Sequence, residues 1–170
     1  WSTYRTNVEL CWKTRVAAGR LTFNGAVFQQ GWDDFQFAIL GQNGLTEIKN
    51  ANQAQIRGLE ADISWAATYN LRLSGGVAIY DTELTENYCG FTDANGDPET
   101  DCASPEAPSG TRLPITADFK GNLTARYTFD VGSFEAHVQG QVLHEGRRST
   151  DLRTAERAIL GDLGAYTLFD

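Results

Sequence analysis

Four arginines crowd one stretch near the end of the sequence, and their chemistry points to anion binding. They are Arg147, Arg148, Arg153 and Arg157. A guanidinium is planar, always charged, and able to hold a carboxylate or phosphate through two parallel hydrogen bonds. We therefore consider these residues candidates for binding an anionic ligand that carries a carboxylate or phosphate. Contact with lipopolysaccharide and simple solvation are the alternatives.

The acidic stretch from Asp93 to Asp101 is a candidate cation site. Oxygen-bearing side chains occupy every second position, in Asp93, Asn95, Asp97, Glu99 and Asp101. Such oxygens can converge on a hard cation such as calcium. However, Pro98 stands at the sixth position, where an EF-hand loop has Gly, and Ser104 stands at the twelfth, where it has Glu. An acidic, solvated turn is therefore the favoured interpretation, and no cofactor other than calcium is suggested.

Two of the three cysteines flank this acidic stretch. Cys89 and Cys102 would pair in an oxidising compartment, which would stabilise the loop by roughly 2–4 kcal/mol. Two free thiols are the alternative. Cys11 is then unpaired, and we expect it on a polar strand face with no catalytic role.

The sequence offers little for catalysis. Ser149 and Asp151 lie near His144, but a hydrolase triad is recognised by geometry rather than by proximity in sequence. His137 and His144 are seven positions apart, which in a strand places them on opposite faces. There is no G-x-S-x-G elbow, no Gly-rich phosphate loop and no Cys-x-x-Cys pair. We expect a protein that is not an enzyme, with a loop-borne Ser/His hydrolase as the last-ranked alternative.

Alternation of apolar and polar residues defines the elements that must position these groups. Between Ala117 and Asp130, Phe119 and Tyr127 belong to an apolar face and Lys120 to a polar one. This period of two predicts a strand with one dry and one wet face. Further strands are expected from stretches that begin near Val8, Leu21, Leu59, Leu71, Phe134 and Ala165. The predicted fold is therefore all-β, an antiparallel up-and-down meander of about seven strands.

The connections between these strands alternate in length. Short turns are expected at residues 17–20, 66–70 and 130–133, and long loops at residues 31–52, 85–114 and 145–162. This pattern, together with strands that are apolar on one face and polar on the other, is typical of an outer-membrane β-barrel. We therefore interpret residues 1–170 as a single β-barrel segment. The Gly41–Gly44 stretch predicts the tip of a hairpin that extends past the membrane, and Thr154–Leu160 predicts a short helix.

The polar strand faces would line the lumen of such a barrel. Their charged members are Glu60, Asp62, Arg72, Asp118, Lys120, Arg126 and Glu135. These side chains would line water or contact a plug, and plain solvation of the wall is the alternative. Phe28 departs from the pattern, which predicts either a bulge or a lumen-facing aromatic residue. The net charge of −8 argues against nucleic acid as a partner.

Several segments resemble strands of TonB-dependent outer-membrane receptors. Residues 7–14, N-V-E-L-C-W-K-T, are similar to the N-Y-E-L-G-W-K strand of that family, and residues 21–28 followed by W-D-D-F-Q are similar to the next strand. Residues 50–61 resemble the N-A…G-x-E-x-E strand. Residues 71–81, and Pro114 with F-K-G-N at 119–122, extend the resemblance over essentially the whole chain.

The resemblance implies a piece of a receptor barrel from its later half. Family members have an N-terminal plug with a TonB box and a barrel of about 22 strands, whereas this sequence shows no counterpart of the plug or the box and has Cys11 where the family has Gly. We take it as a mature product or a fragment. The implied location is the outer membrane, and the implied role is uptake of a scarce ligand such as a ferric siderophore.

The implied partners are outer-membrane lipid, TonB, the plug, and either the missing barrel strands or copies of the chain. An open sheet of about seven strands leaves two unpaired edges, which is why we expect such pairing. A small stand-alone β-barrel that binds a lipophilic ligand, with its apolar face turned inward or covered in an oligomer, is the alternative.

Overall fold

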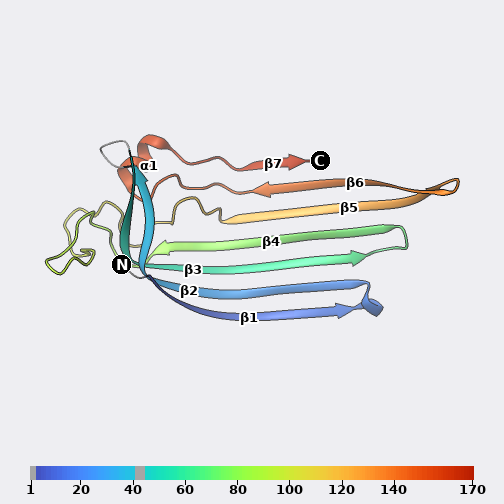
Figure 1. Cartoon of the computed structure of the whole chain (residues 1–170), viewed down its shortest axis with the longest axis horizontal. Coiled ribbons are helices and arrows are strands. Elements are labelled where there is room, and N and C mark those ends of the chain that lie inside the picture. Colours follow the sequence, from blue (N-terminus) through green and yellow to red (C-terminus); the bar gives the residue numbers. More distant parts are fainter. Residues whose placement is uncertain (1–2, 41–44) are drawn as a thin grey trace.

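A single antiparallel sheet organises the chain in the computed structural model, which describes residues 3–40 and 45–170. Within these ranges, seven strands are hydrogen-bonded in chain order (Figure 1). They are β1 (Tyr4–Val16), β2 (Leu21–Leu40), β3 (Thr46–Ala66), β4 (Leu71–Leu84), β5 (Phe119–Val131), β6 (Phe134–Glu145) and β7 (Tyr166–Phe169). The predicted all-β, up-and-down fold is confirmed. The sheet is open, because β1 and β7 form its two edges.

The connections sort to opposite ends of the sheet. The turns after β1, β3 and β5 lie at one end, and the long connections lie at the other, with the short helix α1 (Thr154–Leu160) among them (Figure 1). A 3-10 turn, η1 (Ala17–Gly19), joins β1 to β2. The predicted hairpin tip at Gly41–Gly44 lies outside the described residues, but β2 and β3 extend from both sides well into the 31–52 stretch. No helix in the described part of the chain is long and apolar enough to cross a membrane.

The register keeps the apolar residues on one side of the sheet. Ile79 of β4 lies opposite Phe119 of β5, and Tyr127 of β5 lies opposite Val138 of β6. These side chains are not packed into a dry interior: Leu123 is 49% exposed and Val138 61% exposed. The chain therefore presents a continuous, uncovered apolar face, opposite a polar face of the same strands. The strands do not turn this apolar face inward, which was one of the two forms considered for a stand-alone binder.

Phe28 is a lumen-facing aromatic residue and not the product of a bulge. Residues of β2 and β3 pair without interruption on both sides of it, and Phe28 itself lies opposite Gly58. Its ring covers Gly58 so closely that a β-carbon there would lie 2.4 Å from the ring. The ring also lies 6.2 Å from that of Tyr80. The absence of a side chain at Gly58 therefore makes room for an aromatic ring on the polar face.

The outer half of the β2–β3 hairpin leaves the plane of the sheet and turns across the ends of the other strands (Figure 1). Asp34 adopts a left-handed conformation with φ 54° at this bend. The bend interrupts the alternation of side chains, so Trp32 and Phe35 come into contact with ring centroids 5.5 Å apart. A regular strand would place these two rings on opposite faces.

The buried core of the chain lies at the loop end of the sheet, where the ends of β2, β3 and β4 pack against the long loops. We call this region the loop cap: the outer half of the β2–β3 hairpin together with residues 84–118 and 146–165. Its core residues are Phe35, Phe37, Ala51, Ala54, Leu84, Tyr88, Ala107, Leu113 and Leu152. The hairpin, the loop after β4 and the loop after β6 all contribute, so the cap is one packed unit.

Backbone hydrogen bonds and one disulfide connect the segments of the cap. The amide of Tyr88 donates to the carbonyl of Ala107 at 2.8 Å, and the amide of Ile115 donates to the carbonyl of Ser149 at 2.8 Å. The predicted disulfide between Cys89 and Cys102 is present. The predicted helix at Thr154–Leu160 is confirmed, and its first residue donates through both the backbone amide and the hydroxyl to the carbonyl of Glu106 at 2.9 Å.

Two glycines test how closely the strands pack. A β-carbon at Gly75 would lie 2.6 Å from the backbone oxygen of Asn122 on β5, whereas one at Gly31 would meet nothing within 4 Å. We expect Gly75→Ala to lower the free energy of unfolding by roughly 1–3 kcal/mol, because a backbone atom cannot yield as a side chain can. Gly31→Ala should leave it unchanged or raise it. Thermal unfolding in detergent, followed by circular dichroism, measures both; equal midpoints would contradict the strand packing described here.

Candidate lumenal and loop-borne binding sites

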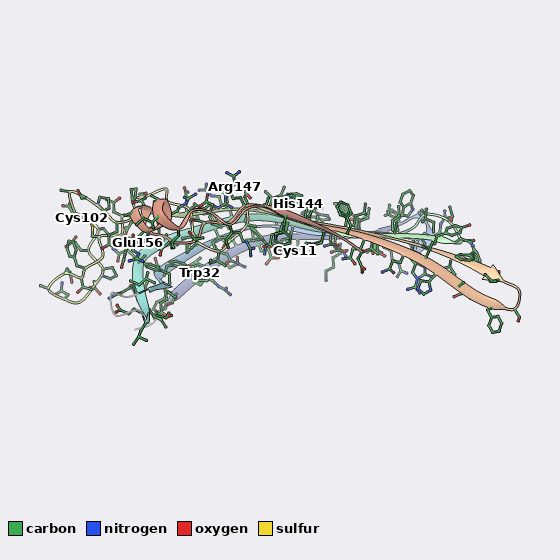
Figure 2. All side chains as sticks on the ribbon, turned by 90° about the horizontal axis from the view of Figure 1, so that it is seen from above. Cys11, Trp32, Cys102, His144, Arg147 and Glu156 are labelled. Atoms are coloured by element: carbon green, nitrogen blue, oxygen red, sulfur yellow. A yellow bond between two sulfur atoms is a disulfide. The ribbon has the colours of Figure 1, made fainter. Side chains whose placement is uncertain are left out.

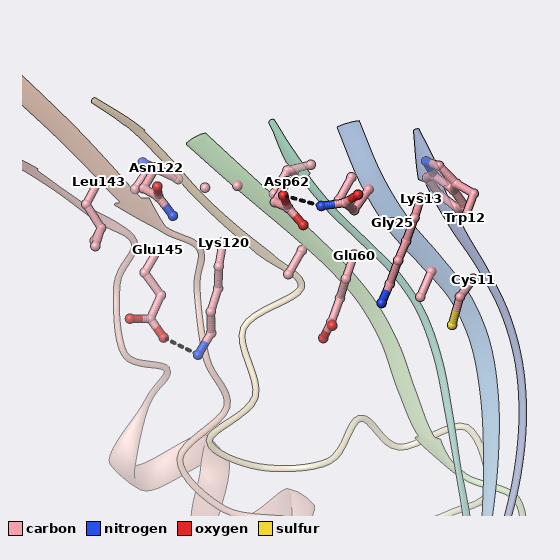
Figure 3. Close-up of a pocket in the computed structure, with 18 residues that line it drawn as sticks. Cys11, Trp12, Lys13, Gly25, Glu60, Asp62, Lys120, Asn122, Leu143 and Glu145 are labelled. Carbon is pink, nitrogen blue, oxygen red and sulfur yellow. Dashed lines mark hydrogen bonds and ion pairs between the residues drawn. The ribbon is translucent and has the colours of Figure 1, made fainter. Parts of the chain in front are cut away.

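The centre of the polar face forms an open cavity of about 560 Å³ (Figure 3). Glu60 and Asp62 of β3 and Lys120 of β5 line it. Between them, the polar face of β4 carries the small residues Gly76 and Ala78, because the register places Asp62 opposite Gly76 and Lys120 opposite Ala78. The small residues of β4 leave space above them, so the charged side chains of its two neighbours reach into a shared polar hollow.

Most charges in this cavity have partners. The amide of Asn24 donates to Asp62 at 3.0 Å, and Lys120 pairs with Glu145 at 3.1 Å. The hydroxyl of Tyr80 donates to Glu60. Figure 3 shows the side chains of Glu60, Asp62, Lys120 and Glu145, with Lys13 extending into the same space. The arrangement suits a hydrated, polar surface with both signs of charge.

Cys11 is a free, exposed thiol on the wall of this cavity, as predicted. Its Sγ donates to a carboxylate oxygen of Glu9 at 3.0 Å. A carboxylate beside a thiol opposes formation of the reactive thiolate. The geometry thus gives no support to a catalytic role for Cys11.

A second part of the predicted lumenal set lies near the short turns. Arg72 and Arg126 face each other directly across β4 and β5, and Asp130 faces Glu135 across β5 and β6. The guanidinium of Arg126 contacts Nδ1 of His137 at 3.1 Å, and in the described ranges neither Arg72 nor Arg126 has a carboxylate within 4.0 Å. Like charges placed directly opposite each other destabilise a sheet. This end of the polar face therefore requires water or a further partner to screen its charges.

Asp118 belongs to a third place, at the loop end of the sheet. It lies just before β5 and pairs with Arg112 at 3.1 Å. The predicted lumenal residues therefore share one face but form three separate groups along it.

The four arginines that are clustered in the sequence have different partners in the structure. Arg153 is tied into the cap by Asp151 at 3.0 Å and by Glu156 at 3.0 Å. Arg157 donates to both carboxylate oxygens of Asp162, at 2.7 and 2.9 Å. Arg153 therefore lies apart from the other three, with its charge neutralised by two acidic neighbours.

The other three arginines meet a fourth one around a cavity of about 360 Å³. It is lined by Arg112, Asp118, Arg147, Arg148, Ser149, Arg157, Asp162 and Ala165. The sequence did not indicate Arg112 as part of this cavity, because it belongs to a different long loop. Its position beside the other arginines depends on the path of that loop, for which the sequence carries no local signal. The Arg157 guanidinium that donates to Asp162 holds the pKa of this carboxyl below its usual range, and Arg147 and Arg112 act in the same direction.

The acidic stretch between the disulfide cysteines forms a closed turn. One carboxylate oxygen of Asp93 accepts the backbone amides of Asn95 at 2.8 Å and Asp97 at 3.0 Å, and these bonds lower the pKa of Asp93. Glu99 accepts the amides of Thr100 and Asp101, both at 2.9 Å. Among the described residues, no three His, Cys, Asp or Glu side chains are placed to hold a metal ion. Calcium binding therefore receives no support from this geometry.

The residues of the suggested hydrolase are not assembled. Ser149 is buried and its hydroxyl donates to the backbone carbonyl of Asp151 at 3.0 Å, while the carboxylate of Asp151 binds Arg153. Nδ1 of His144 contacts the hydroxyl of Thr167 at 2.8 Å, on the apolar face. Nucleophile, base and acid thus have different partners, and the arrangement gives no acyl-transfer site.

The pKa values of Glu106 and Tyr88, both in the cap, are raised. Burial is the largest cause that raises the pKa of Glu106, and the nearby Glu156 and Asp151 add to the shift while Arg153 opposes it. Burial also raises the pKa of Tyr88 to about 12. The cap therefore favours the neutral forms of both groups.

The sequence and the fold were compared with known proteins. The family model described as "TonB dependent receptor-like, beta-barrel" matches residues 3–170. No curated protein matches the chain by sequence.

Several solved structures are similar in fold. One is the ferric yersiniabactin uptake receptor FyuA from Yersinia pestis, with a TM-score of 0.69 and 16% identity over 99% of this chain and 22% of that one. For the siderophore receptor PiuA from Acinetobacter baumannii, the TM-score is 0.65 and the identity 16%, and the match covers 97% of this chain and 21% of the receptor. For the ferric-catecholate import receptor Fiu from E. coli K12, the TM-score is 0.62 and the identity 14%, and the match covers 98% of this chain and 20% of the receptor. The chain thus spans about a fifth of each receptor, and the likeness at this identity concerns the fold.

The raised pKa of Glu106 makes the cap sensitive to pH. The folded cap binds the Glu106 proton more tightly than the unfolded chain does, so cap stability falls as pH rises from the ordinary glutamate range through the raised pKa. We expect Glu106→Gln to reduce this fall. Hydrogen exchange of the Tyr88 and Ala107 amides, compared as protection factors between about pH 4 and about pH 7, measures it. Identical pH slopes in the two proteins would contradict the partial desolvation of Glu106 in the folded cap.

Proposed function

The chain belongs to the TonB-dependent receptor-like β-barrel family, and from that premise we propose that it forms part of the barrel wall of an outer-membrane uptake receptor. The barrels of this family are outer-membrane proteins. The apolar face of the sheet contacts the hydrocarbon region, the polar face lines the lumen, and the loop cap stands at the external mouth.

The observation that carries this proposal is the layering of the apolar face. Near the short turns the face is aromatic, with Trp12, Phe23, Trp65, Tyr127, Phe129 and Phe134. Towards the loops it becomes aromatic again at Tyr4 and Phe119, and the residues between are mostly aliphatic. Girdles of aromatic residues on both sides of an apolar band are the signature of a barrel in a bilayer.

The distance between the girdles fits a membrane. Phe119 and Tyr127 are the outward-facing aromatic residues near the two ends of the membrane-spanning part of β5. At about 3.3 Å per residue the strand between them is about 26 Å long. At a barrel strand tilt of about 35–45° this length covers about 20 Å of the bilayer normal, and continuing to Phe129, the next outward-facing aromatic residue of β5, brings the span to about 25 Å, the height of the apolar band of a membrane barrel. Leu123 then lies near the midplane of the bilayer.

The uptake role rests on the similar receptors. The structures with the same fold are receptors for ferric yersiniabactin, for a siderophore, and for ferric catecholates. By this analogy the present chain takes part in uptake of a scarce ligand such as a ferric siderophore, driven through TonB. The hydrated central cavity around Glu60, Asp62 and Lys120 is compatible with a lumen that admits a polar solute or holds a plug.

The open edges specify a further structural requirement. Among residues 3–40 and 45–170, β1 bonds only to β2 and β7 only to β6, and the odd number of antiparallel strands makes β1 and β7 run in the same direction. Regular antiparallel closure between them is therefore impossible. We assign the remaining partners of both edges to other strands of the same receptor barrel, and copies of the chain are the alternative.

Adjacent residues on opposite faces test the membrane assignment. Leu123→Arg places a charge near the bilayer midplane, which costs about 2–4 kcal/mol on the lipid face of a barrel. Thr124→Arg places the same charge one residue on, facing the lumen. We expect the first change to reduce the fraction of chain inserted into phosphatidylcholine vesicles, scored by resistance to urea extraction, and the second to leave it unchanged. Equal effects, or a compact wild-type monomer in water without detergent, would refute the assignment.

The uptake role is tested separately. Iron-limited cells that lack the receptor containing this segment should take up less ferric siderophore than cells in which it is restored. If uptake is the same in both, the ligand class proposed here is wrong, while the membrane assignment is unaffected.

A further inference from the structure

We propose that the arginine cavity at the base of the loop cap binds a phosphate group. This cavity is the one formed by Arg112, Arg147, Arg148 and Arg157. The inference does not depend on the uptake role, since it rests on the charge, the unpaired donors and the size of the cavity itself.

The cavity has an excess of positive charge. Four guanidinium groups line it against two carboxylates, those of Asp118 and Asp162, which leaves two positive charges. Asp162 is fully engaged by Arg157 through two hydrogen bonds, and Asp118 is engaged by Arg112. A doubly charged oxyanion would balance the remainder.

The two arginines that follow β6 carry most of this excess. Arg148 lies 3.5 Å from Glu145, but Glu145 is shared with Lys120, which is closer at 3.1 Å. Arg147 is exposed and forms no ion pair within the described ranges. Figure 2 shows Arg147 projecting from the sheet on the side opposite to Trp32. One guanidinium is therefore weakly neutralised and the other not at all.

Two donors of the cavity residues are buried without a partner. The Nε atoms of Arg112 and Arg148 are shielded from solvent and have no hydrogen-bond acceptor among the described residues. A buried donor on a charged group is costly when it is left unpaired. Both arginines line the same cavity, and these donors would reach an oxyanion bound there once their guanidinium groups turn toward it.

The several guanidinium donors around the cavity favour a phosphate over a carboxylate, because a phosphate offers them more acceptor oxygens and more negative charge. A carboxylate presents two oxygens and one charge, whereas a phosphate monoester presents three free oxygens and a charge of about −1.5 to −2 at pH 7. A water molecule occupies about 30 Å³ of liquid, so a cavity of about 360 Å³ has room for the phosphate and the start of the molecule that carries it.

The position of the cavity admits two sources of the phosphate. The cavity lies where β5, β6 and β7 meet the loops, since Asp118 precedes β5, Arg147 follows β6 and Ala165 precedes β7. Phe119, the first apolar residue of β5, is adjacent. A phosphorylated lipid of the outer leaflet could therefore reach the cavity from the membrane, and a phosphate on a soluble ligand could reach it from outside.

Phosphate titration of the full chain in maltoside detergent tests the site. Isothermal calorimetry with inorganic phosphate should give one saturable site per chain. Arg112→Gln and Arg148→Gln should each raise the Kd about tenfold or more, as expected when one charged hydrogen-bonding partner is lost. Arg15→Gln, which removes the same charge at the short-turn end of β1, the opposite end of the sheet from the cavity, should change the Kd less than about twofold.

The outcomes separate the site from general charge attraction. No saturable binding by the wild type, or an equal loss in Arg15→Gln, would overturn the proposal. Circular dichroism and an intact Cys89–Cys102 bond establish that the variants remain folded, and if Arg112→Gln unfolds, Arg148→Gln alone decides.

Competition identifies the source of the phosphate. The membrane supplies the phosphate group if three results hold: the wild type binds vesicles that contain phosphorylated lipid A, the Arg148→Gln variant does not bind them, and inorganic phosphate displaces the wild type from them. If only a soluble phosphate monoester competes with inorganic phosphate, a soluble ligand supplies it. Either result supports the site.

Discussion

The hydrogen-bond register of the sheet is the constraint on which the rest of the molecule depends. Side chains alternate along a strand with a period of two, so a slip of one residue between any two strands would move every apolar side chain of one strand to the polar side. The register avoids this across all described strands: Phe23, Ile63 and Leu123 belong to one row of the apolar face, and Asn24, Asp62 and Asn122 to a row of the polar face. The sheet therefore has one face suited to an apolar environment and one face suited to water.

The wall and the loop cap are stabilised in different ways. In the wall, the side chains leave the sheet on both faces and the strands are held together mainly by backbone hydrogen bonds, with apolar groups such as Val138 largely exposed. In the cap, Leu84 and Leu152 are almost completely buried and aromatic rings such as those of Phe37 and Tyr88 meet at 5.0 Å. The loop cap therefore resembles a small globular protein in its packing, whereas the wall relies on its surroundings to cover the apolar face.

The strands and their two faces could be predicted from the sequence because alternation is a local property. The same alternation left Phe28 with two interpretations, and only its pairing with Gly58 of the neighbouring strand distinguishes them. The disulfide and helix α1 were also within reach of local reasoning. The residues that line the arginine cavity could not be predicted in this way. Arg112 lines the cavity and Arg153 does not, because the packing of the loops decides which side chains reach it. Tertiary contacts of residues such as Leu113 and Leu152 decide where each guanidinium lies, and these contacts have no short-range pattern in the sequence.

The shared core of the cap has a consequence for the external mouth. Phe37 comes from one connection, Ala107 from another and Leu152 from a third, yet they belong to a single cluster. Segments that share a core open cooperatively, at a free-energy cost set by the whole cluster. Insertions, deletions and sequence drift in any one of these connections are therefore constrained by the other two, and all three must diversify in concert.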